Sequence, residues 1–242
     1  MGRVKIIAEF SINHFGRIEV AHRMIHHAYH AGVDAVKFQL YDAKTDFPSH
    51  PKLAELRKCQ LSLEQLRVLG KSAKHLGLEF VVTPFIQPKY VNDLVSIGVD
   101  AIKIREADNQ RVELVQTAID TGLPVYISHD PKKNETMKPP VAIPKKVGQV
   151  TWLYCIPLYP PRNYKELDYS RAYFYGGVSL HYPHIEPHLA LTILGLTTHR
   201  EFVVEVHVTE DRSNGALDNP VSLTFPEVEE LVRHLKTVEK IF

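Results

Sequence analysis

The chain has 242 residues, close to the roughly 250 of one (β/α)8 barrel. Lys and Arg (29) nearly balance Asp and Glu (28), which argues against a nucleic-acid partner or an acidic membrane surface. Two cysteines are too few for a disulfide framework. The first residues, MGRVKIIAEF, resemble a strand rather than a signal peptide, and no apolar run approaches the roughly 18 residues that cross a membrane. We therefore expect a cytoplasmic protein.

Eight apolar, β-rich runs follow one another along the chain and predict eight parallel strands. Most runs are continuous rather than alternating, which is typical of strands whose outer face is covered by helices. The predicted strands are Val4–Phe10, Ala35–Leu40, Glu79–Phe85, Ala101–Arg105, Pro124–Asp130, Val150–Ile156, Tyr175–His181 and Phe202–Val208.

Amphipathic segments of helical length separate most of these strands. Glu19–Gly32 carries its apolar residues on one stripe and ends on a glycine, as helices often do. Ser62 with Gln65, and Thr224 with Glu227, have the spacing of capping boxes that open a helix. The repeated order of strand, helix and glycine is typical of α/β units.

The whole chain, residues 1–242, is therefore predicted to be a single-domain α/β protein, a (β/α)8 TIM barrel. A doubly wound open sheet is the alternative, but FSINHFG after the first strand lacks the Gly-rich turn of that fold. Two stretches fit less well. Lys132–Lys146 contains three prolines and is expected to hold at most one short helical turn, and Pro160–Phe174 is predicted as a helix.

Polar residues gather at the carboxyl ends of the predicted strands, where the active sites of such barrels lie. Several form i, i+2 pairs and so share one face of a strand, which must be the lumen. A polar plug without function is the alternative, but burying so many unpaired charges is costly. The residues are Glu9, Lys37, Gln39, Thr83, Lys103, Arg105, Ser128, Ser179, His181, Glu205 and His207, with Asn13 and His14 just after the first strand.

The cations at this end predict an anion with more than one charge. Lys37, Lys103 and Arg105 converge on the mouth, with hydroxyl groups between them. Ammonium and guanidinium groups bind phosphates and carboxylates. A ligand carrying both a phosphate and a carboxylate fits this set.

Two histidines at the same rim predict a metal site. His181 and His207 end neighbouring strands, and Glu205 lies two residues before His207. Two imidazoles and a carboxylate suit a borderline divalent ion such as Mn or Zn. His184 and His188 are weaker candidates, and the histidines of the first helix are expected on a solvated face.

Short motifs in a fixed order then resemble a known family, the N-acetylneuraminate (sialic acid) synthases. The motifs are AEFSINHFG, VKFQ, TPF, IKI, VYIS, LYCIPLYPP, GVSLH and VEVH, followed by HVTEDRSNGALD and VSLTFPEVEELV. The resemblance implies a transferase of carbohydrate biosynthesis. Such an enzyme condenses phosphoenolpyruvate with an N-acylated amino-aldose, such as N-acetylmannosamine, to give a sialic acid-type nonulosonate and phosphate.

The resemblance also implies roles for single residues. His181 and His207 would bind a divalent metal, Mn first, with Mg, Co or Zn as alternatives, and with Glu9 they would form the catalytic set. Glu9 would face the metal and the aldehyde, and Gln39 and Asp218 would reach the sugar. The phosphoenolpyruvate contacts would be Lys37, Thr83, Lys103, Ser128 and Ser179, with Tyr159 lining the same pocket.

Some positions depart from the family pattern. An acidic residue expected between Ser179 and His181 is Leu180. After Lys103, a small serine is displaced by Arg105 and Glu106, and Asp108 takes the acidic position, so Arg105 and Asp108 are substrate-binding candidates. The asparagine of the sixth strand motif is Pro157.

The family usually carries a C-terminal antifreeze-like domain that completes the sugar site of a partner subunit, and we expect this chain to lack it. The expected partners are the two small-molecule substrates, a second copy in a homodimer, and a separate antifreeze-like domain protein. Two other functions stay open. One is another phosphoenolpyruvate-dependent aldol-type synthase, such as one making a 3-deoxy-octulosonate phosphate. The other is a catalytically silent barrel that binds a sugar acid or phosphoenolpyruvate.

Overall fold

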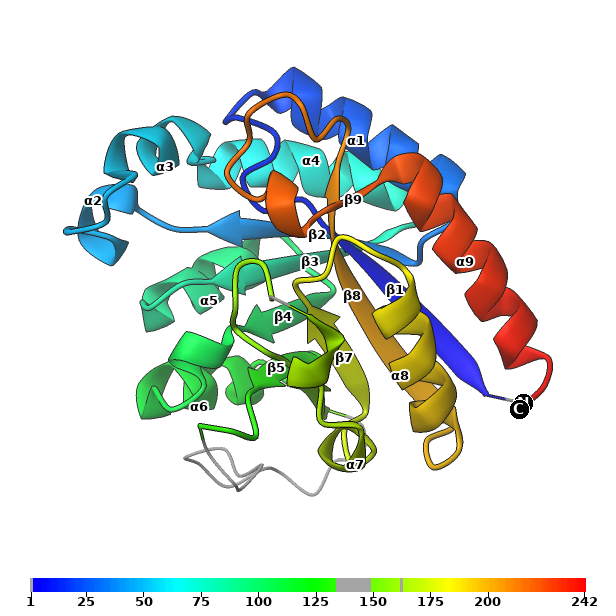
Figure 1. Cartoon of the computed structure of the whole chain (residues 1–242). Helices are drawn as coiled ribbons and strands as arrows, with labels where there is room; N and C mark the ends of the chain where they lie inside the picture. The colour runs from blue at the N-terminus through cyan, green and yellow to red at the C-terminus, as the bar shows by residue number, and fades with distance from the viewer. Residues whose placement is uncertain (1, 134–148, 162) are drawn as a thin grey trace.

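Eight parallel strands close into a barrel surrounded by helices in the computed structural model, which describes residues 2–133, 149–161 and 163–242 (Figure 1). Each strand pairs with the next, and β1 also pairs with β8, which closes the barrel. The strands are β1 (Arg3–Glu9), β2 (Ala35–Leu40), β3 (Glu79–Pro84), β4 (Ala101–Ile104), β5 (Val125–His129), β6 (Val150–Tyr154), β7 (Gly177–Leu180) and β8 (Glu201–Thr209). A two-residue strand, β9 (Leu223–Thr224), pairs in parallel with the end of β8. The predicted (β/α)8 fold is confirmed.

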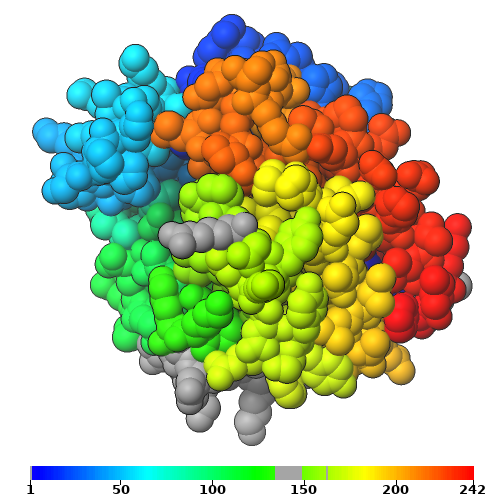
Figure 2. Space-filling model, in the orientation of Figure 1, coloured from blue at the N-terminus to red at the C-terminus, as the bar shows by residue number. Residues whose placement is uncertain are grey.

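The long helices cover the outside of the barrel, and α1, α4 and α9 pack beside one another (Figure 1). They are α1 (Ile18–Ala31), α4 (Leu63–His75), α5 (Pro88–Ser96), α6 (Val112–Asp120), α8 (Glu186–Leu196) and α9 (Phe225–Glu239). Shorter elements lie in the loops: α2 (Ala43–Asp46), α3 (Leu53–Cys59), α7 (Tyr169–Ala172), and the 3-10 turns η1 (Glu106–Asp108), η2 (Tyr164–Glu166) and η3 (Asn219–Val221). The segment of α2 and α3 protrudes at one side of the molecule (Figure 2).

Local signals in the sequence located the helix ends well. Helix α1 ends at Gly32, whose φ of 80° is left-handed and open to glycine without strain. The Ser62–Gln65 capping box opens α4, and the Thr224 backbone N–H donates to Glu227 at 2.7 Å at the start of α9. The predicted helix at Pro160–Phe174 is wrong, because only η2 and α7 form among the described residues there. Most of Lys132–Lys146 lies outside the described residues, so that expectation stays a prediction.

An apolar layer fills the middle of the lumen. Along each strand the side chains alternate between the lumen and the helices, so the residue two positions before a lumen-facing group also faces inward. The layer consists of Ile7, Ala35, Val81, Ala101, Tyr126, Leu153 and Val203. Each of these residues lies two positions before a polar or cysteine residue of the carboxyl end, so the layer forms the base on which the site rests. None of the helices in the described ranges is long and apolar enough to span a membrane.

Candidate active site

A cavity of about 180 Å³ lies at the carboxyl end of the barrel, and all eight strands or the residues that follow them contribute to its wall. The predicted end of the barrel is therefore where polar side chains do converge. Its lining residues are Glu9, Lys37, Gln39, Thr83, Lys103, Arg105, Glu106, Ala107, Ser128, Cys155, Pro157, Tyr159, Ser179, His181, Glu205 and His207.

Two lysines and two glutamates form the floor of this cavity. Lys37 Nζ lies 2.8 Å from Glu9 and 3.7 Å from Glu205, and Lys103 Nζ lies 3.5 Å from Glu205. All four side chains are at most 4% exposed. Because an unpaired buried charge is so costly, the opposite charges of these four groups stabilise one another. Lys37 also donates to Thr83 at 3.1 Å, and Ser179 donates to Glu205 at 2.8 Å.

Burial and neighbouring charge act differently on the four groups. Burial raises the pKa of Glu9, whereas for Glu205 the attraction of Lys103 and Lys37 outweighs the effect of burial and lowers the pKa. Burial lowers the pKa of Lys103, but the pKa of Lys37 is raised because Glu205 and Glu9 outweigh its burial. Glu9 is thus the floor carboxyl that takes up a proton more readily, as a group that exchanges protons with a substrate must.

The two histidines of the rim lie together. The ring centroids of His181 and His207 are 5.1 Å apart, and the ring of Tyr159 lies 4.0 Å from that of His181. His181 Nδ1 pairs with the Ile156 carbonyl at 3.1 Å, which leaves Nε2 free of that bond. Burial lowers the pKa of His181 to about 4 and that of His207 well below its usual value. Both rings are therefore neutral at pH 7, as metal ligands must be.

Glu205 does not complete a three-residue cluster with the histidines. The sequence predicted that Glu205 would lie with the two imidazoles. Its carboxylate instead contacts Ser179 and the two lysines. Within the described part of the chain, no group of three or more His, Cys, Asp or Glu residues is arranged to hold a metal. Of the two rings, His181 has its Nδ1 bound by a carbonyl, the orientation that metal-binding imidazoles have, whereas the buried His207 Nδ1 has no hydrogen-bond partner among the described residues.

Asp218 lies beside the site rather than on its wall. Its carboxylate accepts a hydrogen bond from Ser11 and lies 3.8 Å from His207 Nδ1. Gln39 donates to both Glu9 (2.7 Å) and Ser11 (3.0 Å). A polar chain thus runs from Glu9 to His207. Asp108, likewise predicted to bind substrate, is buried and holds Arg105 in place.

A family model described as NeuB family matches residues 24–242. The chain belongs to the NeuB family. The human N-acetylneuraminate-9-phosphate synthase is 26% identical over 256 residues, covering 97% of this chain and 70% of that protein. N,N'-diacetyllegionaminic acid synthase of Campylobacter jejuni is 25% identical over 265 residues, covering 99% and 78%. The structure of N-acetylneuraminic acid (sialic acid) synthetase from Leptospira borgpetersenii, solved with citrate, matches with a TM-score of 0.88 at 29% identity, covering 99% of this chain and 85% of that chain.

The resemblance seen in the sequence is thereby confirmed, and with it the class of protein, a sialic acid synthase-like transferase. The substitution at Leu180 is explained by the structure of this NeuB chain. Leu180 faces away from the lumen and is 1% exposed. It packs in the main hydrophobic core between the strands and the surrounding helices. Ser179 and His181, on either side, face the cavity. An apolar side chain at this position stabilises the outer layer and leaves the lumen unchanged.

Sequence reasoning missed three contributors to the site. Ser11 joins Gln39 to Asp218 and has a left-handed φ of 47°, which a serine rarely adopts and which no sequence pattern signals. Cys155 lines the floor, where its inward position two residues after Leu153 could have been read from alternation. Ala107 forms part of the wall within η1.

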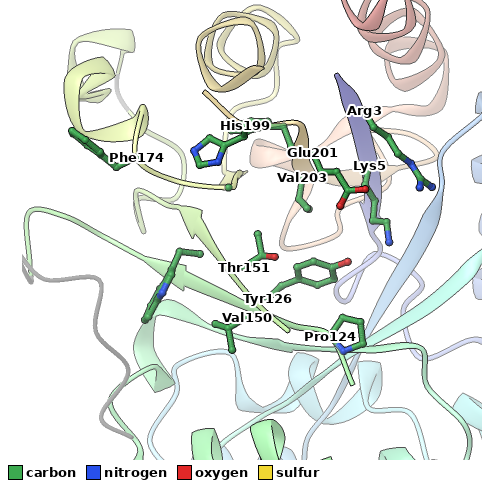
Figure 3. Close-up of a pocket in the computed structure, with 13 residues that line it drawn as sticks. Arg3, Lys5, Pro124, Tyr126, Val150, Thr151, Phe174, His199, Glu201 and Val203 are labelled. Atoms are coloured by element: carbon green, nitrogen blue, oxygen red, sulfur yellow. The ribbon is translucent and has the colours of Figure 1, made fainter. Parts of the chain in front are cut away.

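A second, larger cavity of about 490 Å³ opens at the amino end of the barrel (Figure 3). Lys5, Tyr126, Thr151 and Glu201 are among the residues that line it. Lys5 is bound by Glu79 at 2.7 Å, and both side chains are partly exposed. The apolar layer of the lumen separates this cavity from the NeuB site above. Size alone therefore does not identify the site, because the buried, converging charges lie in the smaller cavity.

Proposed function

We propose that this NeuB protein condenses phosphoenolpyruvate with an N-acylated amino-aldose to give a sialic acid-type nonulosonate and phosphate. The observation that carries the proposal is the floor of two buried lysines beside two neutral imidazoles in one cavity. The family membership supports it. Homodimer formation, a cytoplasmic location and a separate antifreeze-like partner remain expectations.

The floor suits an enol phosphate because it offers both charge and hydroxyl groups. Lys37 and Lys103 can bind the anion. The hydroxyl groups of Thr83 and Ser179 line the same cavity, where Thr83 accepts from Lys37 and Ser179 donates to Glu205. Ser128 Oγ is buried and has no hydrogen-bond partner among the described residues. An unpartnered buried hydroxyl costs roughly 1–3 kcal/mol, so a ligand oxygen that binds it stabilises the complex.

We propose that His181 and His207 hold a divalent ion, with Mn first among the candidates. When bound, the ion would polarise the aldehyde oxygen of the acceptor as a Lewis acid. Tyr159 packs against the His181 ring and limits its motion. Asp218, close to His207 Nδ1, would orient the second ring.

The remaining chemistry is positioning and proton transfer. A bond forms between C3 of phosphoenolpyruvate and the aldehyde carbon, water adds to C2, and phosphate leaves. The lysines hold the enol phosphate close to the acceptor. Glu9, whose pKa burial raises, lies 2.8 Å from Lys37 and would exchange the proton with the acceptor oxygen or the water.

Phosphate release tests this function. The purified chain is incubated with phosphoenolpyruvate and a panel of N-acylated hexosamines, with and without Mn. We expect release that requires both an acceptor and the metal, and its loss in Lys103→Met. A wild-type chain that binds phosphoenolpyruvate but releases no phosphate with any acceptor would instead support a silent binding barrel. A preference for a phosphorylated pentose would support the octulosonate-type synthase.

A further inference from the structure

Arg105 is a fixed cation in the wall of the active-site cavity. It follows the last residue of β4, two positions after Lys103, and so faces the lumen one layer nearer the mouth. Its Nε donates to Asp108 at 2.6 Å, and its guanidinium carbon lies 3.7 Å from the centre of the Phe85 ring. Bonding to a carboxylate and stacking on an aromatic face together restrict the side chain to one orientation.

Asp108 fixes Arg105 without neutralising the wall. This buried carboxylate also accepts from Arg111 Nε at 2.9 Å, so two guanidinium groups share one negative charge. The turn η1 begins directly after Arg105, which brings Asp108 back to it at i+3. The neighbouring Glu106 is bound by Lys133 at 2.8 Å. Arg105 therefore keeps an uncompensated positive charge and the guanidinium N–H groups that Asp108 does not use.

The floor of the cavity has no positive charge to spare. Lys37 and Lys103 are matched by Glu9 and Glu205, so the four groups sum to zero. An enol phosphate brings a carboxylate and a phosphate into the same space. Arg105 is the wall cation that is left to balance the additional charge, together with a divalent ion where one is bound.

Arg105 shares the wall of the cavity with Ser128 of the neighbouring strand. The pairing of β4 with β5 ends at Ile104 with Ile127, and Arg105 and Ser128 are the next residues of the two chain segments. Both residues line the cavity, and Ser128 Oγ is the buried hydroxyl without a partner. Lys103, Arg105 and Ser128 thus line one cavity, and a guanidinium group, an ammonium group and a hydroxyl without a partner are groups that suit a tetrahedral oxyanion.

We propose that Arg105 binds the phosphate of phosphoenolpyruvate, together with Lys103 and Ser128. The assignment rests on the proposed function. It directs the phosphate to the side of the cavity formed by β4 and β5, whereas the two histidines come from β7 and β8. Arg105 is then the residue that distinguishes phosphoenolpyruvate from uncharged enols and from pyruvate.

Calorimetric titration with phosphoenolpyruvate, and separately with inorganic phosphate, tests the assignment without an acceptor. The variants are Arg105→Met and Arg105→Lys, and Arg111→Met is the matched control. Arg111 bonds to the same Asp108 but does not line the cavity, and its side chain is 50% exposed. We expect Arg105→Met to weaken both ligands by roughly 10- to 100-fold, the loss of a charge-assisted bond, and Arg111→Met by less than about threefold. The affinity of Arg105→Lys should lie between those of the two Met variants. An ammonium group keeps the charge but cannot donate the two parallel hydrogen bonds of a guanidinium group.

Equal weakening by Arg105→Met and Arg111→Met would overturn the assignment, since it would reduce the effect to long-range charge. So would an Arg105→Met variant that binds phosphoenolpyruvate normally and instead raises the KM of the acceptor. Thermal melts of each variant identify any that fail to fold, and Arg105→Lys then decides between the two readings. A wild-type chain that binds no phosphoenolpyruvate would overturn the proposed function itself.

Discussion

Two lysine–glutamate pairs lie at opposite ends of the barrel and differ mainly in burial. Lys37–Glu9 at the carboxyl end and Lys5–Glu79 at the amino end have nearly equal separations, 2.8 and 2.7 Å. The side chains of the first pair are 4% and 1% exposed, and those of the second are 23% and 38% exposed. An exposed pair contributes about 0–1 kcal/mol, whereas a buried pair often contributes no more than apolar residues of the same size. Because stability does not account for the buried pair, we propose that it serves ligand binding.

The largest effect is expected at the histidines of the carboxyl end. His181→Ala or His207→Ala should abolish Mn binding and lower turnover by more than about 100-fold, because the proposed ion would lose one of its two protein ligands. Metal analysis of the purified variants and phosphate release measure the two effects. His234→Ala on the exposed face of α9 is the control. A variant that keeps Mn with unchanged affinity would show that this residue is not a ligand.

The buried pair itself gives the second test. The double substitution Lys37→Met with Glu9→Gln removes both charges, so we expect turnover to be lost while the Tm stays the same or rises. Lys37→Met alone should destabilise the protein, since Glu9 and Glu205 lose a partner. Thermal melts and phosphate release on the three proteins separate stability from activity. A double variant that is both inactive and strongly destabilised would indicate that the pair serves the fold.

The buried imidazole of His188 should make the free energy of unfolding depend on pH. Burial lowers the pKa of His188 to about 4, against about 6.5 in the unfolded chain. The unfolded state then binds more protons between pH 6.5 and 4, so this group makes the free energy of unfolding fall as the pH drops through that range and leaves it unchanged above pH 6.5. The expected slope is up to about 1.4 kcal/mol per pH unit for one group.

Urea denaturation at pH 7, 6 and 5 measures this slope in the wild type and in His188→Gln. The difference between the two slopes isolates His188 from other groups, including Glu9, whose raised pKa acts in the opposite direction. Identical slopes would mean that His188 keeps its ordinary pKa when folded.

The smallest effect is expected at the amino end. Lys5→Met with Glu79→Gln should change the free energy of unfolding by less than about 1 kcal/mol and leave phosphate release unchanged, because the pair is screened by water and lies below the apolar layer. The same melts and assays apply. A loss of turnover in this variant would show that the two ends of the barrel communicate, and the comparison would then fail.

The strands and the composition of the site could be read from the sequence because both depend on local pattern. Continuous apolar runs marked the strands, and alternation put Lys37, Ser128 and His207 on the inward face, as the structure has them. Which groups meet across the lumen depends on strand tilt and barrel closure, which no local pattern encodes. Glu205 therefore turned out to bind the lysines rather than join the histidines.

Residues that support the cavity without lining it were the hardest to predict from the sequence. Asp108 and Asp218 stand where the family resemblance put substrate contacts, yet both contact other side chains of the site rather than its cavity. Their positions follow from loop turns after β4 and β8. The segment Pro160–Phe174 was misjudged for a similar reason, since its short turns are capped by Asn163 and Asp168 instead of forming one helix.

The apolar layer across the lumen lies beneath the candidate site, so the site opens toward the carboxyl end of the barrel. The residues of this layer lie two positions before the residues of the floor and separate the candidate site from the cavity at the amino end. Substrates, water, phosphate and product must share one mouth, and the molecule that enters deepest must enter first. For the proposed reaction this implies an obligatory order, with the enol phosphate bound before the sugar. Steady-state kinetics would then show the sugar unable to bind productively until the first substrate is in place.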